Sequence, residues 1–419
     1  MWDPFNEFES ATLPNGLNVH AATWSGRPWE FIGFMIHSGA RYDPEGREGL
    51  AHFVEHLILE NAGLDRRLVE DFFHQNGGQV NFGQTFYFRT YYCFFVPSDR
   101  ETLKKALSFF GRMLLCAKLN KMIEHERKII LHEFCQRYPV KYRLEVDWFK
   151  VRSVYAGQWL ERFVRPIGTP DSINHISKND LQAYYDRHYV PANVSVVGVG
   201  GLKIAELVEM LSDSPFAICK EGRKTTLIKS VKRITPPLVN RKVFPLSKYI
   251  SSNTPLDVCS YQSVAKVPGF FSEQIMALSA LMLNAVLNDE LREKRTWTYA
   301  ISSCFCRLGG FYEFQVNCSE FSVSVIDKIE EVIEDCIGSI KSQQELFERV
   351  KRSMIRRNLM ADLTAEDLCG EAIEDLTYFH RIVSLTEVGK ILEDITMRDI
   401  CDVFQYLTPE KRLTILMRP

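Results

Sequence analysis

Residues 51–57 read Ala-His-Phe-Val-Glu-His-Leu, an apolar helical pattern that carries three polar side chains able to serve a metal site. On a helix, His52 and His56 are four residues apart and share one face, with Glu55 on the next row. Neutral imidazoles are good zinc ligands, and a catalytic zinc takes three protein ligands and leaves a fourth position for water. This is the inverted zincin motif, H-x-x-E-H, and it predicts a hydrolytic zinc site.

A plainer interpretation of the same stretch is a helix with two surface histidines. The flanking residues are apolar nearly all round the helix: Ala51, Phe53, Val54, Leu57, Ile58 and Leu59. Such a helix is expected to be buried. Buried histidines beside a buried carboxylate need partners, and a metal ion is one of the possible partners.

A second predicted helix, at residues 123–136, supplies further carboxylates. Glu126 and Glu133 lie on one face of it, and both can point at the histidine helix. Charged residues on a helix commonly form only its solvated side. Here Ile130 and Phe134 share the helix, which makes a purely polar face less expected. A carboxylate from this helix can therefore complete the ligand set.

Composition limits the class of protein. With 419 residues, 46% of them apolar, the chain can bury a large core in two or more domains. A net charge of -2 gives no electrostatic reason to expect nucleic acid or an anionic membrane as a partner. No apolar run approaches the about 18 residues that span a bilayer, and residues 1–7 lack the features of a signal peptide. Eleven cysteines without a Cys-x-x-Cys pair fit reduced thiols, so a cytoplasmic setting is expected.

The chain repeats itself loosely, with the two copies half the chain apart. The first copy begins at Ile176–Leu181 and closes at Val194–Val197, and the second begins at Ile395–Ile400 and closes at Leu413–Leu416. Each copy starts with a Ser/Thr-x-x-Asp sequence that can cap a helix and ends in a short apolar strand. Two domains of one topology are therefore predicted.

The predicted domains are an N-terminal domain at 1–219, a linker at 220–245 and a C-terminal domain at 246–419. The linker is basic and has Pro236-Pro237 at its middle. The alternative, one long loop within a single domain, is disfavoured by the repeat. Each half mixes strands and helices, so the fold class is α+β. Strands are expected at 31–38 and 86–96, and helices at 69–75, 103–119, 123–136 and 274–287.

These motifs occur together in a known family. The segments that carry the likeness are Leu13–Leu17, Ser38–Arg41, Pro44–Gly46, Gly49–His52, Glu55–His56, Gly77–Asn81, Glu126–Glu133 and Ile167–Thr169. The chain resembles, over nearly its whole length, the pitrilysin/insulinase-type (inverzincin) metallopeptidases and, within them, the short branch related to mitochondrial processing peptidase. The resemblance implies two homologous α/β-sandwich domains, each a mixed sheet with helices packed on it, that form half of a clam-shell chamber.

The resemblance also implies roles for the polar residues of the first half. His52, His56 and Glu133 are expected to bind one zinc ion per chain. Glu55 is expected to be the catalytic base, and Glu126 to support the ligands without binding the metal.

Further residues are implied to hold the substrate. Arg292 and Tyr299 look like the family's arginine–tyrosine pair, which binds the substrate main chain, and Asn81 is expected to bind substrate backbone at a sheet edge. Two segments depart from the family: Leu57–Gly63 lacks its Phe-x-Gly-Thr ending, and Thr296–Thr298 replaces a common Gly-Leu-Ala. Substrate preference is therefore not transferable from other members.

The expected activity is that of a zinc-dependent endopeptidase that hydrolyses unfolded peptides in a closed chamber. Two alternatives remain open: a pathway-specific maturation peptidase that cuts a leader or precursor peptide, and a scaffold subunit without turnover in a heterodimer. Larger single-chain relatives close the chamber with four domains, so a chain with two is expected to form a homodimer. A heterodimer with a related subunit is the alternative.

Overall fold

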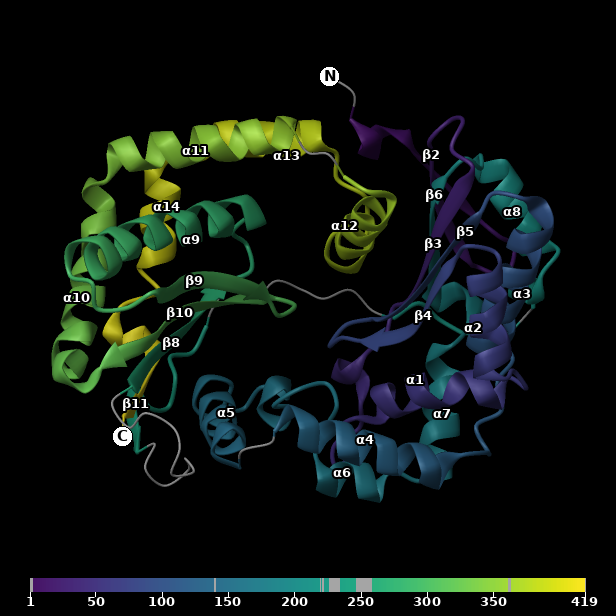
Figure 1. The fold of residues 1–419 in the computed structure, drawn as a ribbon, viewed down its shortest axis with the longest axis horizontal. Coiled ribbons are helices and arrows are strands. Elements are labelled where there is room, and N and C mark those ends of the chain that lie inside the picture. Colours follow the sequence, from purple (N-terminus) through teal and green to yellow (C-terminus); the bar gives the residue numbers. More distant parts are fainter. Residues whose placement is uncertain are drawn as a thin grey trace. The chain divides into compact units, whose positions relative to one another are not determined.

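The computed structural model describes residues 3–138, 141–218, 220, 222–225, 234–245, 258–360 and 363–418. The chain divides into two compact units, each assembled from three stretches of sequence (Figure 1). Unit one comprises Met1–Pro139, Arg165–Leu227 and Asp362–Leu385, and unit two comprises Val140–Val164, Ile228–Ala361 and Thr386–Pro419. Much of the predicted linker lies outside the described residues, as do positions 219 and 246, so the predicted domain boundaries stay predictions.

Unit one is an α/β structure. Its strands are β1 (Phe8–Thr12), β2 (Asn18–Thr23), β3 (Trp29–Ile36), β4 (Gln79–Thr85), β5 (Thr90–Pro97) and β6 (Val194–Gly200). Its helices are α1 (Leu50–Asn61), α2 (Arg66–Gln75), α3 (Arg100–Leu115), α4 (Ile123–Arg137), α6 (Pro170–His175), α7 (Lys178–His188), α8 (Ile204–Ser212) and α12 (Ala365–Tyr378). Short 3-10 turns lie at Pro4–Glu7, Ala40–Tyr42, Pro191–Asn193 and Pro215–Ala217.

The strands of unit one form a six-stranded mixed sheet in the order β1-β2-β6-β3-β5-β4. Strands β2 and β6 run parallel, and the other neighbours are antiparallel. Strand β3 is buried along almost its whole length because helices cover both faces of the sheet. Phe31 and Met35 of β3 pack against Leu368 and Ile373 of α12 on one face. On the other face, the ring of Phe34 stacks on Phe110 of α3, with their centroids 4.8 Å apart.

Unit two repeats this plan. Its strands are β7 (Arg241–Pro245), β8 (Val258–Pro268), β9 (Ala300–Arg307), β10 (Phe311–Ser322) and β11 (Arg412–Arg418). Its helices are α5 (Lys141–Val154), α9 (Glu273–Leu287), α10 (Ile326–Ser339), α11 (Gln344–Leu359), most of α13 (Leu385–Asp394) and α14 (Met397–Phe404). A π-helix at Asn288–Lys294 continues α9, and 3-10 turns lie at Trp159–Arg162, Val323–Val325, Ile340–Ser342 and Pro409–Lys411.

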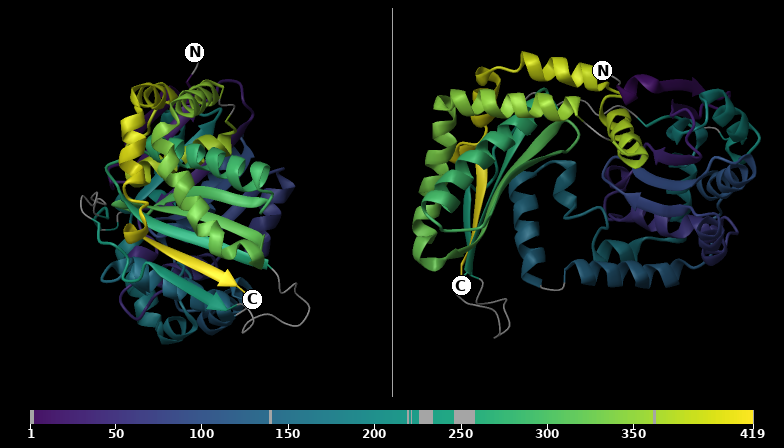
Figure 2. Two further views of the ribbon diagram at one scale, coloured as in Figure 1. Left: turned by 90° about the vertical axis from the view of Figure 1, so that its left-hand side faces the viewer. Right: turned by 45° about the horizontal axis from the view of Figure 1, so that its top comes forward.

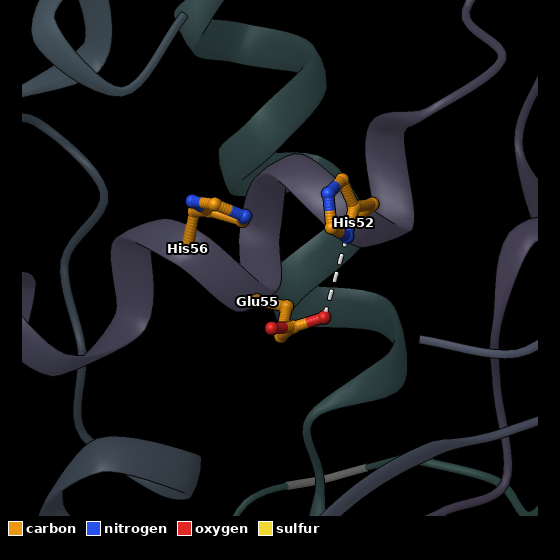
Figure 3. A group of neighbouring side chains, drawn as sticks. All are labelled: His52, Glu55 and His56. Atoms are coloured by element: carbon orange, nitrogen blue, oxygen red, sulfur yellow. Dashed lines mark ion pairs between the residues drawn. The ribbon is translucent and has the colours of Figure 1, made fainter. Parts of the chain in front are cut away.

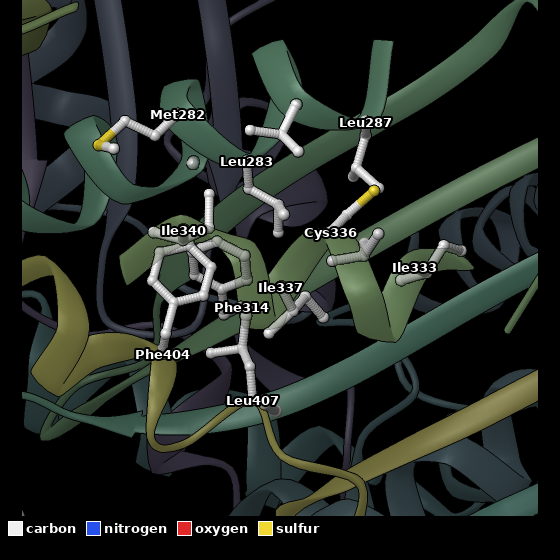
Figure 4. Packing of buried hydrophobic residues seen from close by; sticks show 14 of the residues in the cluster. Met282, Leu283, Leu287, Phe314, Ile333, Cys336, Ile337, Ile340, Phe404 and Leu407 are labelled. Atoms are coloured by element: carbon white, nitrogen blue, oxygen red, sulfur yellow. The ribbon is translucent and has the colours of Figure 1, made fainter. Parts of the chain in front are cut away.

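The five strands of unit two form a sheet in the order β7-β11-β8-β10-β9. Helices α9, α10, α11 and α14 lie on one face of it (Figure 2). Their contacts with the sheet form an apolar core (Figure 4) that includes Met282, Leu283, Leu287, Phe314, Ile333, Cys336, Ile337, Ile340, Phe404 and Leu407. Helix α5 packs against β8 and β11, and the ring of Tyr155 just after it contacts Phe311.

Each unit contains one helix that comes from the other half of the sequence. Helix α12, from the second half of the chain, packs on β3 and β6 of unit one. Helix α5, from the first half, packs on the sheet of unit two. Each sheet is therefore completed by a helix that is distant in sequence from its strands.

The internal repeat predicted from sequence is confirmed. In both copies a capping box begins the helix: Ser177 with Asp180 at α7, and Thr396 with Asp399 at α14. The strand that follows is β6 in one copy and β11 in the other, and each pairs with one parallel and one antiparallel neighbour. The predicted α+β class with two domains of one topology is therefore correct.

The predicted elements also exist, with shifted ends. The strand expected at 86–96 is β5 at Thr90–Pro97, because the aromatic run before it forms the turn from β4. The helix expected at 103–119 is α3, which ends at Leu115. Among the described residues, no helix is both long enough and apolar enough to span a bilayer.

Candidate metal centre

Helix α1 carries the histidine motif, and the start of the helix is held by the carboxylate of Asp43. The N–H groups of Gly49 and Ala51 donate to the two oxygens of Asp43, at 2.8 and 2.9 Å. Gly49 has φ +97°, and a Cβ there would lie 2.4 Å from the carbonyl oxygen of Ile167. Glycine is therefore required for the chain to pass this close before the helix begins.

Helix α4 is fixed beside α1 by Arg127. The guanidinium of Arg127 donates to the carbonyl of Ile176 at 2.9 Å and lies over the ring of Phe53, 5.2 Å from its centroid. Ile130 and Phe134 are buried on the same helix. The carboxylates of α4 are thereby directed at the histidines of α1.

The two histidines converge on one carboxylate oxygen. Oε2 of Glu133 lies 3.1 Å from Nε2 of His52 and 3.7 Å from Nε2 of His56. The side chains of His52 and His56 are 12% and 19% exposed, and that of Glu133 is 26% exposed. Figure 3 shows both rings and Glu55 on α1, with an ion pair between Glu55 and His52. Two imidazole nitrogens and one carboxylate oxygen form a donor set that zinc prefers, so these residues fit a zinc ion.

A carboxylate also faces the other nitrogen of each ring. Nδ1 of His56 lies 3.1 Å from Oε2 of Glu126, and Nδ1 of His52 lies 3.4 Å from Oε2 of Glu55 (Figure 3). A carboxylate that accepts a hydrogen bond from Nδ1–H fixes the tautomer and leaves Nε2 to bind a metal. The expectation that Glu126 and Glu133 both point at the histidine helix is met.

The same contacts perturb the charges of the centre. Burial alone would lower the pKa of His52, but hydrogen bonds with Glu133 and Glu55 outweigh it and raise the pKa. At His56, burial is likewise outweighed by Glu126 and Glu133, which raise the pKa to about 9. The hydrogen bonds from His52 and His56 hold the pKa of Glu133 well below its usual range, so its carboxylate is anionic. Zinc binding requires neutral imidazoles and so competes with protons at this centre.

Two carboxylates are close enough to act as the third ligand. One ligand atom from each of His52, Glu55 and His56 lies within 4.8 Å of the others. Oε2 of Glu55, however, faces Nδ1 of His52 and accepts a hydrogen bond from Oγ1 of Thr85 at 2.7 Å. Glu133 faces the Nε2 atoms of both rings. The geometry favours Glu133 as the ligand and places Glu55 beside the site.

Three neighbours of the centre were missed by sequence reasoning. Thr85 holds Glu55, and Gly83 gives it room, since a Cβ on Gly83 would lie 2.4 Å from Cγ of Glu55. Arg137 donates to Oε1 of Glu133 from Nε at 3.1 Å and from Nη2 at 2.6 Å. One signal was present in the sequence, because Arg137 follows Glu133 by one helical turn and therefore shares its face.

Asn81 lies on β4, which is the edge strand of its sheet. The pairing of β4 with β5 shifts between Asn81 and Gln84, and Oδ1 of Asn81 accepts a hydrogen bond from the N–H of Gly83 at 2.9 Å. The side chain of Asn81 is exposed. It therefore orders the bulge that brings Gly83 to Glu55.

Arg292 and Tyr299 belong to unit two. Arg292 is part of the π-helix, and its guanidinium carbon lies 4.7 Å from the centroid of the Tyr299 ring. The side chain of Arg292 is 44% exposed, and Tyr299 is 79% exposed. The structure thus brings the two members of the predicted pair together on an exposed surface.

The histidines and carboxylates open into one cavity of unit one. Its volume is about 260 Å³. It is lined by His52, Glu55, His56, Gly83, Gln84, Thr85, Glu133, Arg137, Arg165, Pro166 and Ile167. Acidic and basic side chains therefore both line the cavity, and β4 forms part of its wall.

Comparisons with known proteins identify the family to which the chain belongs. The profile described as "Insulinase (Peptidase family M16)" matches residues 30–142, and the profile described as "Peptidase M16 inactive domain" matches residues 175–354. The chain is 24% identical over 405 residues to the beta subunit of the mitochondrial-processing peptidase of Caenorhabditis elegans, an alignment that covers 94% of this chain and 85% of that protein.

Two further likenesses extend the comparison. Subunit 1 of the mitochondrial cytochrome b-c1 complex of Bos taurus is 27% identical over 206 residues, and the match covers 49% of this chain and only 42% of that protein. The crystal structure of a protease from Helicobacter pylori superposes with a TM-score of 0.80 at 18% identity and covers 100% of both chains. At that identity the likeness shows a shared fold.

Proposed function

This chain belongs to the insulinase family of peptidases, and from that premise we propose that it is a zinc-dependent endopeptidase that hydrolyses peptide bonds of unfolded peptides. The observation that carries the proposal is the convergence of Nε2 of His52 and Nε2 of His56 on Oε2 of Glu133. A chain that retained only the fold would have no need to keep this donor set together.

Each residue of the centre has a distinct part in the proposed reaction. When bound, zinc supplies Lewis acidity that activates water and polarises the scissile carbonyl. His52, His56 and Glu133 hold the metal. Glu55 takes a proton from the attacking water and returns it to the leaving amine. The hydroxyl of Thr85 holds Oε2 of Glu55 and so fixes the direction of the other oxygen.

The proposed substrate is an extended peptide that adds to the edge of the unit-one sheet along β4. Main-chain hydrogen bonds provide affinity in this mode, with little demand on side chains. Asn81 supports the strand, and Arg292 and Tyr299 bind the substrate main chain. A chain that must be extended and enclosed in a chamber cannot remain folded, so flexible peptides are the expected substrates.

A second candidate function is pathway-specific maturation of a leader or precursor peptide. It is favoured by the match to a processing-peptidase subunit over 94% of the chain. A third candidate, a scaffold subunit without turnover, is favoured by the match to subunit 1 of the cytochrome b-c1 complex. We propose a cytoplasmic location, although relatives carry mitochondrial names, and localisation of a tagged full chain will check it.

The function is tested by digestion of a peptide library with and without a chelator, read by mass spectrometry. Internal cleavage that stops with the chelator and returns with zinc supports an endopeptidase. Cleavage confined to one leader-like sequence supports maturation. Intact peptides in every sample, from protein that binds zinc, would support the scaffold.

We propose further that the chain acts as a homodimer in which Arg292 and Tyr299 of one subunit serve the zinc site of the other. A heterodimer with a related subunit is the alternative. In a dimer with two-fold symmetry, the zinc site of each subunit faces Arg292 and Tyr299 of the other subunit. The dimer therefore has two composite sites.

Mixing two inactive variants, Glu55→Gln and Tyr299→Phe, is expected to restore roughly a quarter of wild-type activity after dissociation and reassociation. A mixed dimer has one site in which both Glu55 and Tyr299 are intact, and random pairing makes half of the dimers mixed. Peptide cleavage is the measurement, with exchange verified by labelled chains. Complete exchange with activity at background would refute the composite site.

Thr85→Val is expected to lower kcat by about tenfold, because Glu55 loses a hydrogen bond that is worth roughly 1.5–3 kcal/mol for a charged group. Zinc content should not change, since the hydroxyl of Thr85 donates its hydrogen bond to Glu55, which is not a proposed ligand of the metal. The matched control is Thr12→Val on β1, where the hydroxyl donates to Asn18 instead. Unaltered kcat in Thr85→Val would show that this contact does not position the base.

A further inference from the structure

Two arginines, Arg137 and Arg165, line the catalytic cavity, and they differ in their contacts with carboxylates. Arg137 donates twice to Oε1 of Glu133, at 3.1 and 2.6 Å, so its charge is paired with the carboxylate. Arg165 also lines the cavity and is exposed. Within the described part of the chain, no ion pair involves Arg165.

The position of Arg165 is set by helix α4. Nε of Arg165 donates to the hydroxyl of Tyr138 at 3.2 Å, and its guanidinium carbon lies 6.0 Å from the centroid of that ring. Tyr138 is buried at the end of α4, where its ring contacts Phe134 with the centroids 5.0 Å apart. One edge of the guanidinium is therefore anchored, and its terminal nitrogens remain to bind a ligand in the cavity.

The charges of the cavity are suited to an anion. Glu55 and Glu133 contribute two negative charges to the cavity. Arg137 and Arg165 contribute two positive charges, so the charges of these four side chains sum to zero. A bound zinc ion adds two positive charges. In addition, the guanidinium of Arg165 is planar, and a guanidinium can donate two parallel hydrogen bonds to the two oxygens of one carboxylate.

We propose that Arg165 is a specificity-determining residue that binds a carboxylate of the substrate close to the scissile bond. The enzyme is thereby selective for acidic peptides. This inference rests on the proposed peptidase function and names the substrate class of the same site. The carboxylate belongs either to an aspartate or glutamate side chain or to the free C-terminus of the peptide, and the chemistry of recognition is the same.

The arrangement of the cavity limits where the acidic residue can lie. The lining includes Gln84 and Thr85 of β4 and the segment Arg165, Pro166 and Ile167. In an extended peptide that pairs with β4, successive side chains point to opposite faces, so only alternate ones point into the cavity. Selectivity is therefore confined to one position beside the cleaved bond and does not extend over the whole peptide.

The test compares kcat/KM for peptides that differ only by glutamate or glutamine at a single scanned position, all with amidated C-termini. A second set carries a free C-terminus and no acidic side chain. Wild type is expected to prefer the carboxylate by about tenfold at one position or at the chain end, and the preference should shrink with added salt. Arg165→Gln should reduce it to about twofold or less while zinc content and Tm stay at the wild-type values.

The control is Arg100→Gln, because Arg100 is an exposed arginine of unit one that pairs with Glu209 on another helix and lies outside the cavity lining. It should keep the full preference. Equal cleavage of glutamate and glutamine peptides by wild type, with zinc dependence intact, would overturn the role of Arg165 and leave the peptidase function standing. A preference that survives in Arg165→Gln would also overturn it. Absence of cleavage of every peptide would instead overturn the proposed function.

Discussion

Glu55→Gln is expected to reduce kcat for peptide hydrolysis by about three orders of magnitude while zinc stays bound at one ion per chain. Glutamine has the shape of glutamate and its amide oxygen can still accept from Thr85, but it cannot take a proton from water. The loss should therefore fall on the chemical step and leave metal binding unaltered. Steady-state kinetics with a fluorogenic peptide and elemental analysis of the same sample measure both quantities.

The matched control for this variant is Glu101→Gln, which changes an exposed carboxylate in the first turn of α3, outside the cavity lining. It should retain full activity and zinc. If Glu55→Gln lost its zinc, Glu55 would be a ligand and the assignment of Glu133 would be wrong. If Glu55→Gln kept wild-type kcat, another group would have to be the base.

Glu133→Ala is expected to weaken zinc binding by more than about a hundredfold and to abolish activity at stoichiometric metal. Alanine removes the oxygen on which both Nε2 atoms converge, and a site with two histidines lacks the third protein ligand. Competition with a chromophoric chelator measures the affinity. Excess zinc should restore activity only in part, because the geometry of the site is lost as well as its affinity.

The two variants are informative together because they are expected to fail in opposite ways. Glu55→Gln keeps the zinc and loses turnover, whereas Glu133→Ala loses turnover because it no longer holds the zinc. A Glu133→Ala protein that held zinc as tightly as wild type would contradict the ligand set. Arg137→Gln provides a milder comparison, since it frees one oxygen of Glu133 and leaves the other in place.

Much of this architecture could be predicted because the signals are local in sequence. The spacing of His52 and His56 places both rings on one helical face, and the Ser/Thr-x-x-Asp sequences at Ser177 and Thr396 form capping boxes in the structure. The direction of Glu126 and Glu133 followed from the same helical periodicity. In each case the prediction depends only on the spacing of residues within one helix.

The remainder depends on packing between distant segments. No local signal shows that α12 covers the sheet of unit one or that α5 packs on that of unit two, because many apolar helices could cover the same strands. The sequence likewise does not predict the hydrogen bond from Thr85 to Glu55. That bond joins β4 to α1 and depends on the bulge in β4. The pairing of Arg292 with Tyr299 was implied by family resemblance alone.

A zinc titration tests the central assignment most directly. Metal is removed with a chelator, zinc is returned in measured amounts, and hydrolysis of an unfolded peptide is followed at each addition. We expect no cleavage without metal, a linear rise in rate with added zinc, and a plateau at one zinc per chain that depends on His52, His56 and Glu133. Cleavage that persists without metal, or one tightly bound zinc with no cleavage of any peptide, would contradict this assignment.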